Sequence, residues 1–300
     1  DSYLDFRFGF FKSSIKNSKI AIRLFDEILE PKEKELLGGT GIECLCLNAL
    51  VNCILGEFQK TLDNRRLIVS IMKTISYKGA FHDGLANIVK INLWLKEFKK
   101  IEPPLNKLLE IESEDFLKFS NVRAFEALIR GTILSHQQDY NNAIAKVSNA
   151  IQFFNSKGNI SGRDLDYLAL TDMYQKNGSL INAKRTLAKA VDNQKKTGER
   201  VYCARVARIH GNILRAEGKF YQAEEKYLEA IQIAREQSAK LFELYAVEDL
   251  CTLWHQQGKT EQAYARLSEM LAQFDGQPEV GILREAKALL ETFQVKPIAQ

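Results

Sequence analysis

The sequence predicts an all-α fold: a right-handed α-solenoid of about seven helix pairs that repeat every 40 residues, followed by a C-terminal capping helix. Two observations support this prediction. The chain has 5 prolines in 300 residues, which suits a mostly helical protein because proline breaks helix interiors. In addition, small and large residues recur at a fixed spacing, and a hydrophobic content of 45% is enough to bury a long core around them.

The repeat is clearest in four segments of the C-terminal half. The expected first helix of each segment holds a small residue: Gly131, Thr171, Gly211 and Cys251. The expected second helix holds an alanine and, four positions later, a larger residue: Ala143 and Val147, Ala183 and Leu187, Ala223 and Tyr227, and Ala263 and Leu267. The turns between them lie near Gly178, Gly218 and Gly258. Small side chains let two helices approach closely, and the larger ones fill the space between neighbouring repeats.

Projecting the step toward the N-terminus gives three weaker copies, in which Ala21, Thr61 and Ile101 take the alanine position. The step from Ile101 to Ala143 is 42, so a two-residue insertion is expected near Ser113. One domain over residues 1–300 then consists of repeats near 2–41, 42–81, 82–123, 124–163, 164–203, 204–243 and 244–280. The amphipathic stretch ILREAKALLETF, near 281–294, is expected to cap the last repeat with no partner after it.

A glycine turn followed five residues later by alanine is the tetratricopeptide signature, here in a unit longer than the usual ~34 residues. The chain also resembles the helical-repeat arms of bacterial signal-transducing P-loop ATPases, many of which carry a class III adenylate cyclase domain. The strings LWHQQGK, LREAKALLE, GIECLCLNALVNCILGEF and AFEALIRGTILSHQQDY carry this resemblance, which covers most of residues 40–293. It implies a sensor or protein-docking arm, like the related superhelical domain of maltose-operon activators.

In that family the arm follows a nucleotide-binding module, which this sequence does not contain. Gly38, Gly39, Thr40 and Gly41 form a glycine cluster, but without a G-K-[ST] ending no lysine can reach a phosphate, so a loop between helices is expected. The chain starts at Asp1 rather than methionine, which indicates a piece of a longer protein. An ATPase or cyclase domain of the same full-length chain could then be one partner.

Charge and motif content argue against several other functions. A net charge of +4, spread evenly over both halves, disfavours nucleic-acid binding. The 5 cysteines form no C-x-x-C pair and the 4 histidines no H-E-x-x-H pair, so neither a metal nor a cofactor is expected. No nucleophile elbow or dinucleotide fingerprint points to an enzyme. No apolar run approaches the ~18 residues of a membrane span, and a cytoplasmic location is expected.

The concave surface of the solenoid is the candidate binding site. In the sixth repeat its expected residues are Arg205, Arg208, Asn212 and Arg215, spaced so that all point to one side of a helix. Guanidinium groups there could bind a carboxylate or phosphate, and Arg208 with Asn212 resembles part of the carboxylate clamp of chaperone-binding tetratricopeptide domains. The alternative is that these arginines pair across the groove with Asp172 and Glu248.

The corresponding positions of the earlier repeats are apolar: Tyr3, Phe6, Phe10, Leu50, Leu93, the adjacent Trp94, Phe125 and Leu128. This stripe could seat a helix or an extended peptide, or its residues could belong to the core. The groove is therefore expected to present two surfaces, an apolar one toward the N-terminus and a basic one in the sixth repeat. The sequence predicts a non-enzymatic protein- or peptide-binding scaffold, with a small-molecule effector domain as the alternative.

Overall fold

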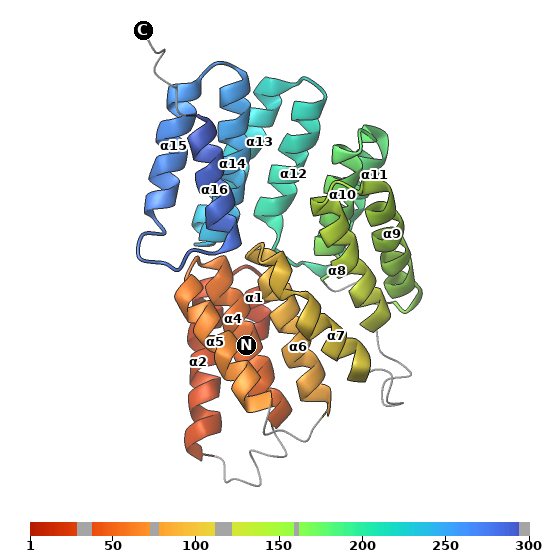
Figure 1. The fold of residues 1–300 in the computed structure, drawn as a ribbon, viewed down its shortest axis with the longest axis vertical. Coiled ribbons are helices and arrows are strands. Elements are labelled where there is room, and N and C mark those ends of the chain that lie inside the picture. Colours follow the sequence, from red (N-terminus) through yellow and green to blue (C-terminus); the bar gives the residue numbers. More distant parts are fainter. Residues whose placement is uncertain (29–37, 73–77, 112–121, 159–161, 294–300) are drawn as a thin grey trace.

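A computed structural model describes residues 1–28, 38–72, 78–111, 122–158 and 162–293 of the chain. Within these ranges the protein is helical and contains no strand. The paired helices stack side by side along a superhelix (Figure 1), which confirms the predicted helical-repeat solenoid. The single-domain division and its repeat boundaries stay predictions. No helix in the described part of the chain is long and apolar enough to span a bilayer.

The first three helix pairs precede the four regular repeats. They comprise α1 (Ser2–Arg7), α2 (Phe11–Ile28), α4 (Gly38–Ile54), α5 (Phe58–Met72), α6 (Lys78–Trp94) and α7 (Glu102–Ile111), with a short 3-10 helix, η1 (Phe98–Lys100), before α7. The regular pairs follow as α8 (Val122–His136), α9 (Tyr140–Ser156), α10 (Asp164–Lys176), α11 (Leu180–Thr197), α12 (Cys203–Ala216), α13 (Phe220–Glu236), α14 (Lys240–Gln256) and α15 (Thr260–Ala272), and α16 (Gly281–Thr292) comes last.

The small residues of the repeat lie where one helix of a pair meets the other. A Cβ atom at Gly211 in α12 would lie 2.6 Å from the Tyr227 ring of α13, so only glycine fits between these two helices. Ala223, which faces this contact, is fully buried, and so are Ala143, Ala183 and Ala263 at the equivalent positions. The 40-residue pattern is therefore a pattern of close helix contacts within each pair.

The N-terminal register is correct for the second and third pairs and wrong for the first. Thr61 and Ile101 are fully buried near the starts of their second helices, as expected. Ala21 is half-buried, and the equivalent position belongs to Ser14, which is buried and exchanges hydrogen bonds with Ser2. The reason is a longer first step, because the left-handed turn residues Gly9 and Gly56 are 47 positions apart rather than 40.

Two other sequence expectations concern segments between helices. The glycine cluster at Gly38–Gly41 is not a loop, because α4 begins at Gly38 and includes it. The turn residues Lys96 and Gln138 are 42 positions apart, in agreement with a two-residue insertion between them. Ser113, where the insertion was expected, lies outside the described residues.

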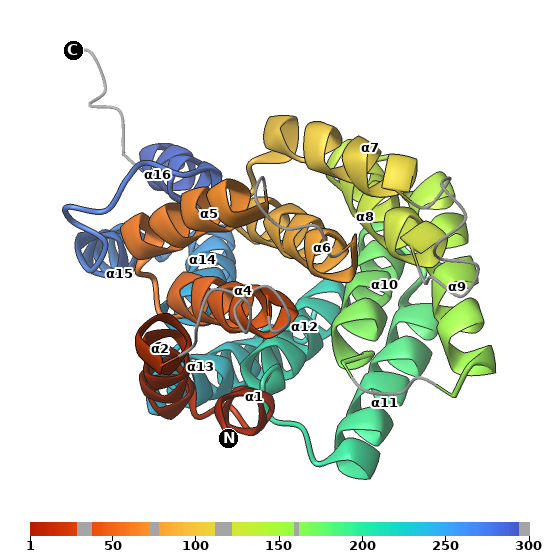
Figure 2. The same cartoon turned by 90° about the horizontal axis from the view of Figure 1, so that it is seen from below.

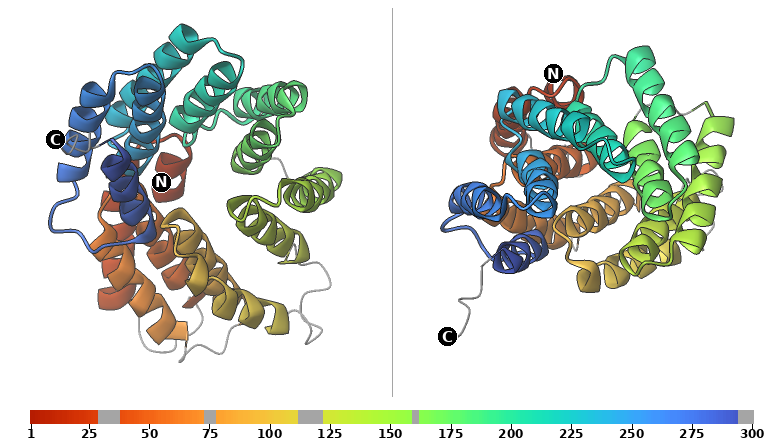
Figure 3. Two further views of the ribbon diagram at one scale, coloured as in Figure 1. Left: turned by 45° about the horizontal axis from the view of Figure 1, so that its top comes forward. Right: turned by 90° about the horizontal axis from the view of Figure 1, so that it is seen from above.

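The superhelix closes on itself. In Figures 1 and 2 the C-terminal helices lie against the N-terminal ones, and Figure 3 shows the chain returning beside its starting point. The capping helix α16 is the last described helix, as expected, and it also contacts the N-terminal half of the chain, because the Gly281 N–H donates to Glu97 (3.0 Å) and the Ile282 N–H donates to the Leu95 carbonyl (3.0 Å). A third hydrogen bond joins the Tyr245 hydroxyl of α14 to the Trp94 carbonyl at the end of α6 (3.0 Å).

A second junction closes the ring on its other side. Arg7, at the end of α1, donates from Nε to the buried Glu199 carboxylate (2.9 Å), and its carbonyl accepts from the N–H groups of Arg200 and Val201. Glu199 and its neighbours form the connection between α11 and α12. The first repeat therefore contacts the end of the fifth, and the concave side becomes the wall of a cavity that is partly open to solvent.

Candidate functional site

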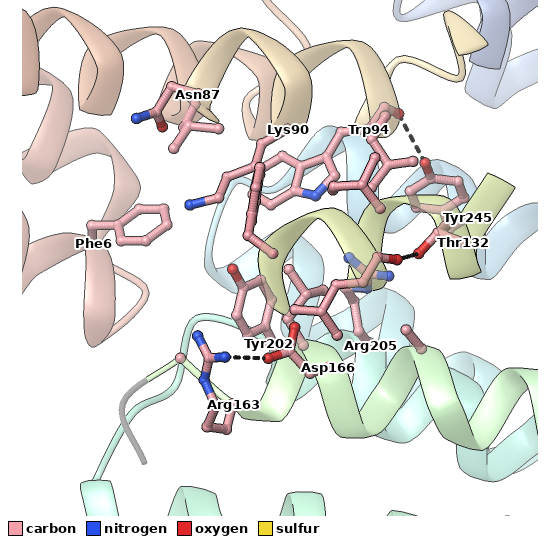
Figure 4. Close-up of a pocket in the computed structure, with 18 of the residues that line it drawn as sticks. Phe6, Asn87, Lys90, Trp94, Thr132, Arg163, Asp166, Tyr202, Arg205 and Tyr245 are labelled. Carbon is pink, nitrogen blue, oxygen red and sulfur yellow. Dashed lines mark hydrogen bonds and ion pairs between the residues drawn. The ribbon is translucent and has the colours of Figure 1, made fainter. Parts of the chain in front are cut away.

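A cavity of about 1410 Å³ fills the interior of the closed ring. Its wall includes side chains from α1, α4, α6, α8, α10, α12 and α14, which are the first helices of the successive repeats (Figure 4). The same repeat position recurs around this wall. Leu50, Lys90, Thr132, Asp172 and Asn212 follow one another at steps of 40, 42, 40 and 40, and all five line the cavity. The helical repeat therefore determines which side chains face inward.

All six predicted site residues line this cavity. Arg205, Arg208, Asn212 and Arg215 come from α12, and Phe125 and Leu128 come from α8. The apolar and basic stripes are thus not two separate surfaces, because closure of the ring brings them into one space.

Most of the apolar stripe has a double role. Tyr3, Phe6, Leu50, Leu93 and Trp94 line the cavity as well, and the side chains of Leu50 and Trp94 also belong to the buried core. The stripe therefore both lines the cavity and contributes to the core, since a core side chain can present one edge to the cavity. Phe10 is different, because it is 61% exposed and lies outside the cavity wall.

Two of the candidate polar residues are already engaged within the chain. Arg208 forms an ion pair with Asp249 (Nη1 to Oδ2, 3.0 Å), and its guanidinium lies over the Tyr245 ring at 5.3 Å. Burial lowers the pKa of Arg208, but Asp249 and Asp172 offset this, so the pKa lies above its ordinary value. Asn212 is buried and accepts a hydrogen bond from the Tyr227 hydroxyl (2.6 Å).

The ion pairs differ from those expected across the groove. Asp172 forms an ion pair with Lys176 of its own helix (2.8 Å), and Arg208 forms one with Asp249 rather than with the adjacent Glu248. Glu248 forms no ion pair or side-chain hydrogen bond with any described residue. Burial raises the pKa of its carboxyl group to about 7, against the opposing charge of Lys96.

Arg205 is a further half-buried cation of the stripe that lines the cavity. Its guanidinium lies 6.0 Å from the centre of the Tyr202 ring and 5.8 Å from that of Phe242. Among the described residues it has no ion-pair partner, and its buried Nε has no acceptor. Burial lowers the pKa of Arg205, and the neighbouring charge of Arg208 lowers it further.

Lys90 is a second inward-facing cation, which the sequence reading missed. Its Nζ lies 5.6 Å from the centre of the Phe125 ring, and in Figure 4 it extends from α6 toward the side of the cavity where Phe6 lies. Burial lowers the pKa of Lys90, while Asp166 partly offsets this. The repeat could have identified this residue, since Lys90 occupies the same position as Asn212. In the same way, Tyr245 follows Arg205 by one repeat.

The cavity offers little for metal or thiol chemistry. Across the described ranges no cluster of three histidine, cysteine or acidic side chains could hold a metal ion. Cys46 also borders the cavity, but burial raises the pKa of its thiol to about 12, so that it stays protonated. Rings, apolar side chains and charged groups make up the lining of the cavity.

The fold is shared with known tetratricopeptide-like proteins. The structure is similar to that of a Rap protein crystallised in complex with competence and sporulation factor, with a TM-score of 0.64 and 14% identity over 98% of this chain and 85% of the other. It is also similar to the apo form of RapI, with a TM-score of 0.52 and 11% identity over 84% of this chain and 70% of that one. No protein-family model and no curated protein matches the sequence.

The two similarities to Rap proteins support the helical-repeat solenoid fold. A tetratricopeptide repeat protein from Parabacteroides merdae is a third similar structure, with a TM-score of 0.49 and 16% identity over 97% of this chain and 96% of that one. The chain has a tetratricopeptide-like helical-repeat fold, and the first helices of its repeats border a cavity that is partly open to solvent.

Proposed function

We propose that this chain is a non-enzymatic scaffold that binds a short peptide segment of a partner inside its closed superhelix. The observation that supports this proposal most directly is the size of the cavity. Its volume of about 1410 Å³ exceeds the ~300–1,000 Å³ typical of small-molecule sites, so a peptide fits the space better than a single small effector.

The composition of the wall is also suited to a peptide. Rings and aliphatic side chains of α1, α4, α6 and α8 can hold apolar side chains of a ligand, while charged groups of α10, α12 and α14 can hold polar ones. The similar Rap protein was crystallised with competence and sporulation factor, which adds support by analogy of fold.

The larger setting of this scaffold is part of the proposal. The resemblance to helical arms of signalling ATPases and cyclases supports a regulatory arm that communicates ligand binding to another domain of a longer cytoplasmic protein. A ligand bound in the cavity would then contact the first helices of the repeats, and through these helices it would act on the whole superhelix.

Affinity capture from a pool of random heptapeptides tests the proposal. The parent chain should enrich a defined set of peptides, whereas Thr132→Trp should not, because the indole would fill space that Thr132 borders. Ile181→Trp is the matched control, since Ile181 is 75% exposed on the second helix of its pair. Thermal denaturation verifies that both variants fold.

Three results would overturn the peptide proposal. The parent could enrich no peptide, or Thr132→Trp could retain the same peptides as the parent. Saturable thermal stabilisation by small metabolites that Thr132→Trp abolishes, without peptide capture, would replace it with the effector-sensing alternative.

A further inference from the structure

Some of the charged side chains that line the cavity have an ion-pair partner, and others have none. Four ion pairs neutralise most of them: Arg163 with Asp166, Lys176 with Asp172, Arg208 with Asp249, and Lys96 with Glu285. After these pairs are set aside, Lys90, Arg205 and Arg215 form no ion pair with any described residue, although all three are at least half-buried.

The remaining acidic groups form no ion pair with these cations. Glu43 and Asp1 also border the cavity but are exposed to water, and the charge of the half-buried Asp83 acts on Lys90 from a distance. Glu248 is the half-buried carboxyl group that has no ion-pair partner within the described part of the chain. Because its pKa lies at about 7, it is charged only in part near neutral pH. Lys90, Arg205 and Arg215 are thus half-buried cations that form no ion pair with the carboxyl groups of the wall.

Arg205 is placed to hold an anionic group. The Tyr202 and Phe242 rings border its guanidinium and limit its hydration, while Arg208 beside it is already paired with Asp249. A half-buried guanidinium without an acid partner is costly, because its charge has lost water without gaining a counter-ion. A carboxylate that enters the cavity can supply that counter-ion in bidentate geometry.

Lys90 provides a second anchor from a different wall. Its ammonium lies beside the Phe125 ring and comes from α6, whereas Arg205 comes from α12, so a ligand that contacts both cations binds two different helices of the wall. A ligand with two acidic groups separated by apolar side chains matches this arrangement, because Phe125, Leu128 and Trp94 also line the cavity.

We propose that the peptide bound by this cavity is acidic, with one carboxylate on Arg205 and a second on Lys90. This inference rests on the proposed function and specifies its ligand. It assigns carboxylate binding to Arg205 and Lys90 instead of Arg208 and Asn212, both of which have partners within the chain.

Capture from charge-sorted heptapeptide pools tests the inference. Acidic, neutral and basic pools of equal length and equal apolar content are each presented to the parent, to Arg205→Met and to Lys90→Met. The parent should retain the acidic pool about tenfold or more over the neutral one, and each variant should lose most of that preference. Arg185→Met, which removes an exposed cation of α11 outside the cavity, should keep it.

Thermal denaturation of the same variants provides a second readout. Removal of an unpaired half-buried cation should leave the melting temperature unchanged or raise it, so that a loss of acidic preference cannot be attributed to unfolding. If Arg205→Met instead melts well below the parent, the guanidinium is structural and the inference is wrong.

The outcomes separate this inference from the proposed function. Capture that Thr132→Trp abolishes, but that shows no preference for acidic peptides, would overturn the acidic ligand and leave peptide binding standing. Acidic preference that survives in both Arg205→Met and Lys90→Met would overturn the assignment of these anchors. No capture from any pool would overturn both proposals.

Discussion

Closure of the superhelix depends on the absence of a side chain at one residue, Gly281. This first residue of α16 lies directly against the backbone that follows α6, where a Cβ atom would lie 2.7 Å from the Leu95 carbonyl oxygen and would also overlap the Lys96 carbonyl. Both obstacles are main-chain atoms, which cannot rotate away as a side chain can. Gly281→Ala should therefore displace α16 from the end of α6.

The expected cost follows from the hydrogen bonds at this junction. Displacement would break the bonds from the Gly281 N–H to Glu97 and from the Ile282 N–H to the Leu95 carbonyl. A buried donor left without an acceptor costs about 1–3 kcal/mol, whereas alanine in a helix gains at most about 1 kcal/mol over glycine. The net loss of unfolding free energy should be about 1–5 kcal/mol.

Thermal and urea denaturation followed by circular dichroism can measure this loss. The matched control is Gly84→Ala in α6, where the new methyl group meets the flexible Met72 side chain, with Sδ at 2.5 Å, instead of backbone. That substitution should change stability by less than about 1 kcal/mol, because the thioether can move aside. If Gly281→Ala is as stable as the parent, the close approach of α16 to α6 does not hold the ring closed.

Two further predictions concern the cavity wall and the repeat contacts. Burial raises the pKa of Glu248 to about 7 from an ordinary value of 4.5, so the protonated form stabilises the fold, and the parent should lose stability as pH rises through this window. In Glu248→Gln this loss should be smaller, because only the share of Asp166, whose pKa burial raises to about 6, remains; equal shifts of melting temperature in both proteins between about pH 5 and about pH 8 would contradict the prediction. Ala223→Leu should cost about 1–3 kcal/mol by overpacking the contact between α12 and α13. Gln222→Leu, at an exposed position, should cost little, and similar melting of both variants would argue against the proposed register.

The regular repeats were predictable because close helix contacts restrict residue size. Gly211 and Ala223 meet at such a contact, and the same restriction recurs at every 40-residue step. The first repeat was misplaced because its turn, at Gly9, precedes the next by 47 positions, so projection of a constant step reached Ala21 instead of Ser14. The repeat predicts the position of a helix only in those parts of the chain where the spacing between repeats stays constant.

The candidate site was predictable in part of its membership and not in its form. The repeat position gave six residues that all line the cavity and missed others such as Lys90, and a local period does not determine how far the small rotations between successive helix pairs turn the superhelix. Ring closure depends on contacts such as Tyr245 with Trp94, 151 positions apart. The partner of Arg208 was missed by one residue, since neighbouring side chains on a helix point in different directions and Asp249, not Glu248, faces the guanidinium.

The junction between α16 and α6 has a consequence for how the chain acquires its structure. An open repeat array can fold pair by pair as it is synthesised, since each pair needs only its neighbours. Here Glu97 receives its hydrogen bond from Gly281, 184 positions later in the chain. During translation the end of α6 therefore stays uncovered until α16, the last described helix, has left the ribosome and can pack against it. The wall of the cavity is thus completed only in a late step of synthesis.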